Sequence, residues 1–139
     1  MTVLAVDPGS RRIGVAISDP DGKVGFPLDV LQRSGDWLGR LAELVRERDV
    51  GEVLVGLPRR LDGSEGPAAE QARALAAALA SAIPVPVRLV DERMTTAAAD
   101  RALAAAGVRS RRRRRVVDGS AAALLLQSYL DTSPRRGGI

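Results

Sequence analysis

The alternation of apolar and polar positions predicts a chain that begins with strands and continues with alternating helices and strands. Two apolar runs rich in β-branched residues, 3–6 and 13–17, flank a Pro-Gly-Ser-Arg turn and predict an opening β-hairpin. The first run is apolar at every position, as is typical of a central strand buried on both faces. A turn at 19–22 separates this hairpin from a third expected strand over 23–31.

The remaining elements are predicted from helical spacing and from short apolar runs. Leu38, Leu41 and Leu44 share one face of an expected helix that ends near Asp49. The chain then gives expected strands over 53–57 and 85–90, and expected helices over 67–82, from Thr95 or Thr96 to 106, and over 119–130. The arginine-rich stretch before Asp118 is expected to be a loop, and 132–139 a disordered tail.

The order of these elements predicts an α/β fold. Three antiparallel strands followed by strand–helix units imply a mixed five-stranded sheet with helices on both faces. Ligands of such sheets collect at the carboxyl ends of the strands. Asp7, Arg59 with Arg60, and the segment 91–93 all follow strands at that edge. Asp118 would join them if the last helix packs back across the sheet.

The composition narrows the chemistry. With 139 residues, 45% of them hydrophobic, the chain has the size of one domain, which we place at 1–131. The absence of cysteine and histidine excludes thiolate nucleophiles, cysteine zinc sites and the commonest general base. Any reaction must use carboxylates, hydroxyls, arginine, the single Lys23 and hard cations. A chain without cysteine, signal peptide or membrane-length apolar run is expected to be cytoplasmic.

The net charge of +4 conceals an uneven distribution. Eight arginines lie between positions 109 and 136, and without them 13 basic residues face 17 acidic ones. One basic tract on an acidic body usually marks contact with a polyanion. The five consecutive arginines 111–115 therefore indicate nucleic acid as the partner. A solvated charge run, enriched in arginine by genomic composition, is the alternative.

Carboxylates from three distant parts of the chain, brought to one edge, need a cation to offset their repulsion. Oxygen-only ligation favours Mg²⁺ or Mn²⁺ over zinc. Two such ions about 4 Å apart can activate a water and stabilise the leaving oxygen of a phosphodiester. Each acid also has a structural alternative. Asp7 can form a turn, Asp118 can cap its helix, and Asp91 or Glu92 can pair with Arg93.

Four segments carry a specific resemblance: Asp7-Pro8-Gly9 with 12–16, 55–58 with 62–64, 91–96, and Asp118 with Ala121, Ala122 and 125–127. In this order, over nearly the whole chain, they resemble the YqgF/RuvX family of bacterial ribonuclease-H-like proteins. Members of that family are described as Holliday junction resolvases and as nucleases for the 5′ end of pre-16S ribosomal RNA. The family's basic stretch usually mixes lysine and arginine, whereas here it is all arginine.

The resemblance implies a ribonuclease-H-like fold and a trio of catalytic and metal-binding residues, Asp7, Glu92 and Asp118. The alternation of side chains in 87–92 leaves open whether Asp91 or Glu92 is the ligand, so Asp91 stays an alternative. We expect a nuclease that depends on Mg²⁺ or Mn²⁺. The expected substrate-binding residues are Arg11, Arg12, Arg59, Arg60, Arg93, Arg111, Arg112, Arg113, Arg114 and Arg115.

The sequence leaves the substrate and several alternatives open. Processing of the 5′ end of pre-16S rRNA is favoured by resemblance over cleavage of structured DNA. A resolvase would need a two-fold dimer to cut two strands symmetrically, and both a monomer and a homodimer remain open. A non-catalytic RNA-binding module is a further alternative. The Asp-x-Gly-Ser turn also occurs in ATP-binding relatives of this fold, but those close two domains around ATP, and the chain has no Gly-x-x-x-x-Gly-Lys-Ser/Thr loop.

Overall fold

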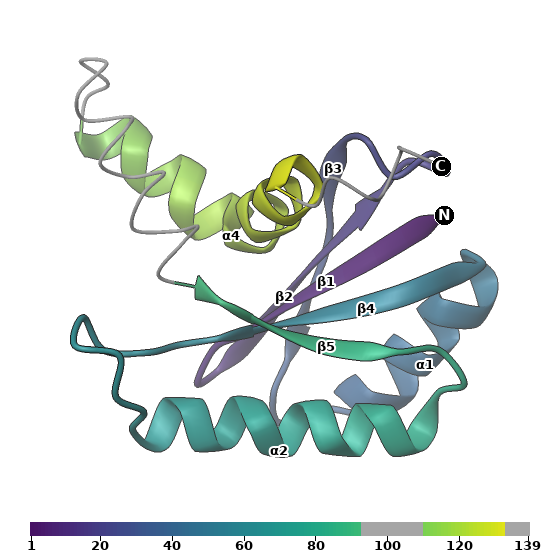
Figure 1. The fold of residues 1–139 in the computed structure, drawn as a ribbon, viewed down its shortest axis with the longest axis horizontal. Helices are drawn as coiled ribbons and strands as arrows, with labels where there is room; N and C mark the ends of the chain where they lie inside the picture. Colours follow the sequence, from purple (N-terminus) through teal and green to yellow (C-terminus); the bar gives the residue numbers. More distant parts are fainter. Residues whose placement is uncertain (93–109, 133–139) are drawn as a thin grey trace.

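The computed structural model describes residues 1–92 and 110–132, and for 110–120 it describes the backbone alone. The elements within these residues lie in three layers, with a sheet between helices (Figure 1). The strands are β1 (Thr2–Pro8), β2 (Arg12–Ser18), β3 (Gly25–Gln32), β4 (Val50–Leu57) and β5 (Val87–Asp91). The helices are α1 (Trp37–Glu47), α2 (Pro67–Ala82) and α4 (Ser110–Thr132).

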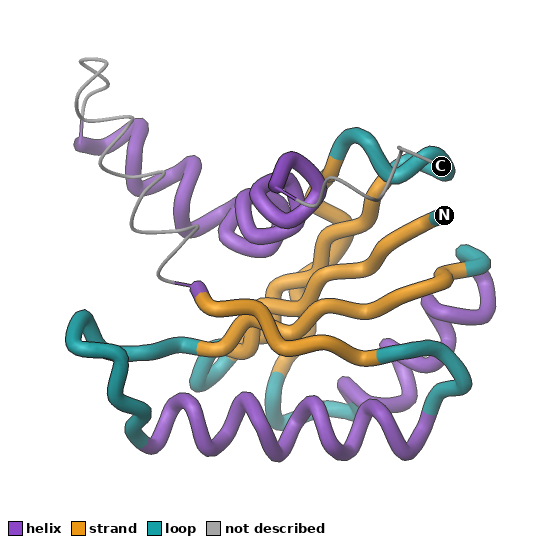
Figure 2. The backbone as a smooth tube through the Cα atoms, viewed as in Figure 1, coloured by secondary structure: helices purple, strands orange, loops and turns teal. Residues whose placement is uncertain are grey.

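The five strands form one mixed sheet in the order β3-β2-β1-β4-β5 (Figure 2). β1 pairs antiparallel with β2, and β2 pairs antiparallel with β3. β4 lies parallel to β1 on one side and to β5 on the other. The ends of β1, β4 and β5 therefore meet at one edge of the sheet. This arrangement confirms the predicted mixed five-stranded α/β fold.

The core lies on both faces of the central strand. Side chains of a strand alternate between the two faces of its sheet. Accordingly, Leu4 and Val6 of β1 pack with the leucines of α1 and α2, whereas Val3 and Ala5 pack with α4. All four are fully buried. The prediction of a first strand buried on both faces is confirmed.

α4 is fastened to the sheet by its second half. Ala122, Leu125, Leu126 and Leu130 bury their side chains against the sheet. The side chain of Gln127 adds two hydrogen bonds at 2.9 and 3.0 Å, accepting from the backbone N–H of Gly25 and donating to the carbonyl of Lys23. These contacts fix α4 across the face that carries Val3 and Ala5.

The expected loop of arginines before Asp118 is wrong, because α4 begins at Ser110 and includes 111–115. Arginine is among the better helix formers, and the sequence has no glycine or proline between Ser110 and Gly119 to stop the helix. Asp118 therefore lies inside α4 and does not cap it. The helix predicted from Thr95 or Thr96 to 106 and the tail predicted after Thr132 lie outside the described residues.

The other predicted elements exist, and their bounds differ by at most three residues, with α2 observed over the predicted 67–82. β4 begins at Val50, earlier than its apolar run suggests, because Glu52 lies within the strand. Within residues 1–92 and 110–132, no helix combines the length and hydrophobicity needed to cross a membrane.

Candidate active site

Asp7 lies near the end of β1, on the face that α4 covers. Val3 and Ala5 of the same strand pack against α4, and a period of two places Asp7 on that side. Its partner in the antiparallel ladder is Gly14 of β2. A Cβ atom on Gly14 would lie 3.7 Å from the Cβ atoms of Asp7 and Ala122. Asp7 is therefore close to both β2 and the second half of α4.

Glu92 directly follows β5 and reaches Asp7. Its carboxyl group is mostly buried and hydrogen bonded to the Asp7 carboxylate. Burial, this hydrogen bond and the negative charges of Asp7 and Asp91 raise the pKa of Glu92 to about 9. Two acids from distant parts of the chain are thus in contact, and the Glu92 carboxyl holds a proton at neutral pH. Such a pair favours any cation that can take the place of the proton.

The Glu92 side chain extends from the end of β5 to Asp7 of β1 and passes over Gly56 of β4. A Cβ atom on Gly56 would approach the Cγ and Cδ atoms of Glu92 to 3.0 Å, and Oε1 more closely still. A real side chain at this position would therefore displace Glu92. Sequence reasoning missed this residue. The signal was a lone glycine in the apolar strand 53–57, which often marks the close approach of another group.

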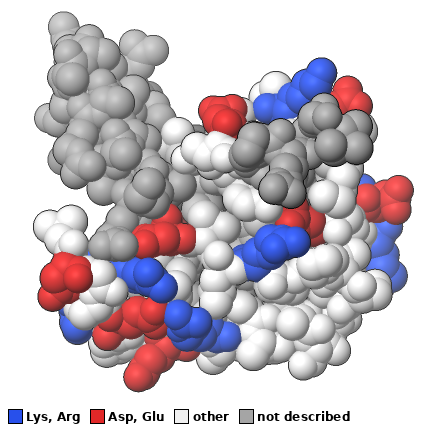
Figure 3. Space-filling model, in the orientation of Figure 1, with Lys and Arg blue, Asp and Glu red and all other residues white. Residues whose placement is uncertain are grey.

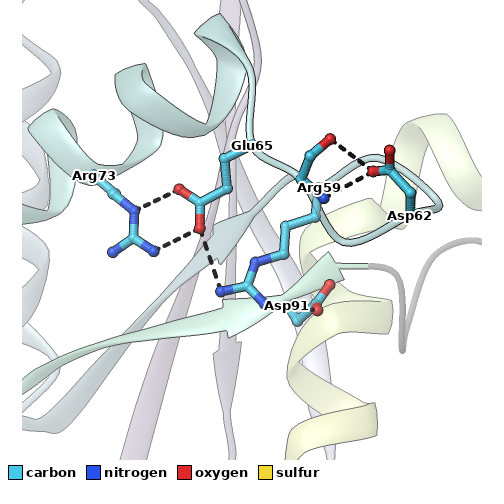
Figure 4. Close-up of polar contacts among 6 residues, drawn as sticks. Arg59, Asp62, Glu65, Arg73 and Asp91 are labelled. Atoms are coloured by element: carbon cyan, nitrogen blue, oxygen red, sulfur yellow. Dashed lines mark hydrogen bonds and ion pairs between the residues drawn. The ribbon is translucent and has the colours of Figure 1, made fainter.

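Asp91 points away from this pair and toward the loop after β4. Its Oδ2 lies 3.6 Å from Nη1 of Arg59, and Nη2 of Arg59 lies 3.3 Å from Oε2 of Glu65 (Figure 4). Glu65 in turn accepts two hydrogen bonds from Arg73 of α2, at 2.8 and 2.7 Å. The structure therefore brings Glu92 to Asp7, and Asp91 to a row of ion pairs.

A cleft of about 570 Å³ opens beside Asp7, between β2, β3 and α4. Its lining residues are Asp7, Arg12, Gly14, Val15, Pro27, Leu28, Asp29, Val30, Ala121, Ala122 and Ala123. The small side chains of α4 and Gly14 keep this space open.

Several predicted site residues have no described side chain. Arg93 lies outside the described residues, and so do the side chains of Asp118 and of the arginines 111–115. In the backbone, Asp118 is one helical turn before Ala122, which lines the cleft. Among the residues with described side chains, no group of three Asp, Glu, His or Cys is placed to hold a metal ion. The described pair, Asp7 and Glu92, offers only oxygen ligands, which fits a hard divalent cation.

The described arginines near the edge differ in their surroundings. Arg12 lines the cleft, and Arg11 is exposed beside it. Arg60 is exposed and donates a hydrogen bond to the Ser64 hydroxyl at 3.4 Å, whereas Arg59 lies between two carboxylates. Around the loop after β4 and the start of α2, basic and acidic side chains lie side by side (Figure 3).

Comparison with known proteins identifies the family. The family model RuvX, described as Holliday junction resolvase, matches residues 1–132. The chain belongs to the RuvX family. A relative from Pelotomaculum thermopropionicum, named "Putative pre-16S rRNA nuclease", is 48% identical over 141 aligned positions, and the alignment covers 98% of this chain and 92% of the relative. A Thermobifida fusca relative of the same name is 51% identical over 142 aligned positions, and the alignment covers 95% of this chain and 88% of the relative.

A solved structure has the same fold. The RuvC protein of T. thermophilus, in complex with a Holliday junction substrate, matches with a TM-score of 0.56 and 19% identity, covering 96% of each chain. RuvX and RuvC thus share a fold despite their distant sequences. The expected ribonuclease-H-like architecture is confirmed, and the family and relatives are nucleases, as the sequence predicted.

Proposed function

We propose that this RuvX protein is a nuclease that depends on Mg²⁺ or Mn²⁺ and processes the 5′ end of pre-16S rRNA, with 1–131 as its nuclease domain. The contact between Asp7 and Glu92 carries this proposal. These acids come from distant parts of the sequence, meet at the carboxyl edge of the sheet and border a cleft. A structural role would more readily pair each acid with a cation than with another acid.

The proposed catalytic and metal-binding residues are Asp7, Glu92 and Asp118. Asp118 is included because the resemblance implies it and because its backbone lies in α4 one turn before Ala122, a residue that lines the cleft. Asp91 is not included, since it is paired with Arg59. Divalent ions held by this trio would supply an activated water and stabilisation of the leaving oxygen. The protein's own task is to align three carboxylates and to bring a phosphodiester to them.

The basic side chains are proposed to hold the substrate through its phosphates. Arg12 borders the cleft, and Arg11 and Arg60 are exposed near it. Arg93 and the arginines 111–115 extend this set along the chain. Arginine suits the task because its planar fork binds phosphate oxygens with two hydrogen bonds. An RNA substrate, and with it a cytoplasmic location, is favoured by the names of the relatives at about half identity.

Cleavage of Holliday junctions is the second candidate, favoured by the description of the RuvX family and by the fold shared with a junction-bound RuvC. This activity would require a two-fold dimer, because both strands must be cut symmetrically. RNA processing needs one active site and is open to a monomer.

One comparison tests the proposal. A precursor RNA with a 5′ extension of the 16S sequence and a four-way DNA junction are incubated with the protein and Mn²⁺ at the same salt concentration. We expect faster cleavage of the RNA, and no cleavage with EDTA or with Asp7→Asn. Preferred cutting of the junction would assign the second candidate. RNA binding without cleavage of either substrate would indicate a non-catalytic RNA-binding module.

A further inference from the structure

We infer that Arg59 is a positioning residue that orients Glu92 through Asp91, and that it is not a phosphate contact. This inference rests on the proposed function, because it concerns the same metal site. Sequence reasoning placed Arg59 among the substrate-binding arginines. Its surroundings in the structure assign it a different task.

The Arg59 side chain is partly buried and contacts two carboxylates of the same chain. Its two terminal nitrogens lie 3.6 Å from Asp91 and 3.3 Å from Glu65. Glu65 is held in place by Arg73, whose hydrogen bonds lower the pKa of the Glu65 carboxyl. The four side chains alternate in charge from α2 to the end of β5 (Figure 4). With a carboxylate against each terminal nitrogen, Arg59 has little attraction left for a phosphate.

The position of Asp91 decides where Glu92 can lie. Successive residues of a strand point to opposite faces of the sheet. Val90 packs on the side of α4, Asp91 turns to the loop after β4, and Glu92 contacts Asp7 on the side of α4. An anchor on Asp91 therefore fixes the direction of the next side chain. The same ion pair also offsets the charge of a third acid beside Asp7 and Glu92.

Such an anchor has a measurable effect on metal binding. A residue that orients a metal ligand without binding the metal itself typically contributes 10- to 100-fold to metal affinity or activity, and this is lost when the residue is removed. A phosphate contact would act differently. Its loss would raise KM and flatten the dependence of log K on log salt by about 0.7 per contact on single strands.

The experiment compares Arg59→Met with Arg60→Met and Arg46→Met. Arg60 is the exposed neighbour, proposed above as a phosphate contact, and Arg46 is an exposed arginine of α1 that controls for a lost charge. For each variant we measure Mn²⁺ binding by calorimetry without nucleic acid, kcat and KM for RNA cleavage, and the salt dependence of RNA binding. Circular dichroism confirms that each variant folds.

For Arg59→Met we expect Mn²⁺ affinity and kcat to fall about tenfold, with KM and the salt slope unchanged. Arg60→Met should instead raise KM and flatten the slope, and Arg46→Met should change neither Mn²⁺ affinity nor kcat. Arg59→Lys should recover part of the loss because it keeps the positive charge. The recovery should be incomplete, because one ammonium group cannot bridge both carboxylates. If Arg59→Met does not fold, Arg59→Lys and Glu65→Gln carry the test, each with a smaller loss of Mn²⁺ affinity expected.

Unchanged Mn²⁺ affinity together with a flatter salt slope in Arg59→Met would overturn the inference. A crystal structure of that variant gives an answer that does not depend on activity. We expect the Glu92 carboxyl to have left Asp7, and an unmoved Glu92 would also refute the inference. A wild-type protein that binds Mn²⁺ but cleaves no nucleic acid would refute the proposed function alone.

Discussion

Two carboxylates on the α4 side of the sheet, the buried Glu52 and the half-buried Glu92, have opposite surroundings. Glu52 lies near the start of β4, is 4% exposed and accepts hydrogen bonds from Arg88 of β5 and from the Tyr129 hydroxyl of α4. Glu92 lies at the other end of the sheet, and its hydrogen-bond partner is a second acid, Asp7. One carboxylate joins three elements of the fold, whereas the other stands against a group of its own kind.

The partners of a buried acid, more than its identity, separate structure from function here. The pair of Glu52 and Arg88 raises the pKa of the guanidinium through their hydrogen bond and opposite charges. The pair of Asp7 and Glu92 holds the Glu92 carboxyl in its neutral form instead. At Glu52 the charge is already neutralised by Arg88, so a metal cation gains little there. At Asp7 and Glu92 a metal cation would offset the repulsion between two carboxylates. Metal binding is therefore expected at the Asp7 end only.

The largest effect should come from removing an acid of this pair. Asp7→Asn and Glu92→Gln each lose a proposed metal ligand and should slow cleavage on the order of a thousandfold or more, a loss of several kcal/mol of transition-state stabilisation. Single-turnover cleavage of RNA with Mn²⁺ measures the rate. The fold should stay intact by circular dichroism.

Asp91→Asn is the matched variant, one residue from Glu92 and turned to the opposite side of β5. It retains the side chain's size, weakens the ion pair with Arg59 and removes a negative charge close to Glu92. A smaller loss than in Glu92→Gln is expected. A dead Asp91→Asn beside an active Glu92→Gln would mean that the roles of the two neighbours are exchanged.

The choice between these neighbours shows where sequence reasoning ends. The chain order and strand ends predict that Asp7 and the 91–93 segment reach one edge of the sheet, because carboxyl ends of parallel strands do. The direction of each side chain depends on the residue at which β5 ends and on the partner that holds Asp91. Arg59 and Glu65 come from a loop whose shape is not encoded in a local pattern.

The arginine tract and Glu52 illustrate two other limits. A run of like charges favours a loop, but arginine's helix propensity and the absence of breakers extend α4 back to Ser110. Glu52 stands within an otherwise apolar strand, and only the sheet register reveals Arg88 beside it, paired opposite Leu54. Long-range partners of this kind are set by topology.

The stability of the metal-free protein is expected to depend on the protonation of Glu92. Glu92 has a folded-state pKa of about 9, above its ordinary value of 4.5, so the folded protein holds a proton that the unfolded chain releases. In metal-free protein, stability should therefore fall as pH rises between these values, by about 3 kcal/mol from pH 5.5 to 8. Urea unfolding in EDTA measures this change.

Glu92→Gln is the control for this titration, because an amide has no proton to lose in this range. The unfolding free energy of Glu92→Gln should therefore lack the fall from pH 5.5 to 8 that is expected for the wild-type protein. Saturating Mn²⁺ at pH 8 should stabilise the wild-type protein and not the variant. Parallel pH profiles for the two proteins would show that the pKa of Glu92 is not raised in the folded protein.

At the other end of the sheet, the expected effect is on stability alone. Arg88→Met removes the guanidinium from the buried Glu52 and should lower the unfolding free energy, by less than the loss of a fully buried pair would because Arg88 is largely exposed. Glu52→Gln should cost less, since its amide oxygen still accepts hydrogen bonds. Cleavage per folded molecule should not change in either variant. A loss of Mn²⁺ affinity in them would contradict the separation of the two sites.

The smallest expected effect is a change in Mn²⁺ affinity when either of two glycines on the α4 side of the sheet is replaced by alanine. A Cβ at Gly56 would collide with Glu92, whereas one at Gly14 would make ordinary contacts of 3.7 Å with Asp7 and Ala122. Gly56→Ala should therefore push the Glu92 carboxyl from Asp7 and weaken Mn²⁺ binding about tenfold, as displaced metal ligands do. Gly14→Ala should keep Mn²⁺ affinity within about twofold, because its methyl group displaces no carboxyl oxygen. Calorimetry without nucleic acid measures both. Equal affinities in the two variants would show that Glu92 reaches the metal by another path than over Gly56.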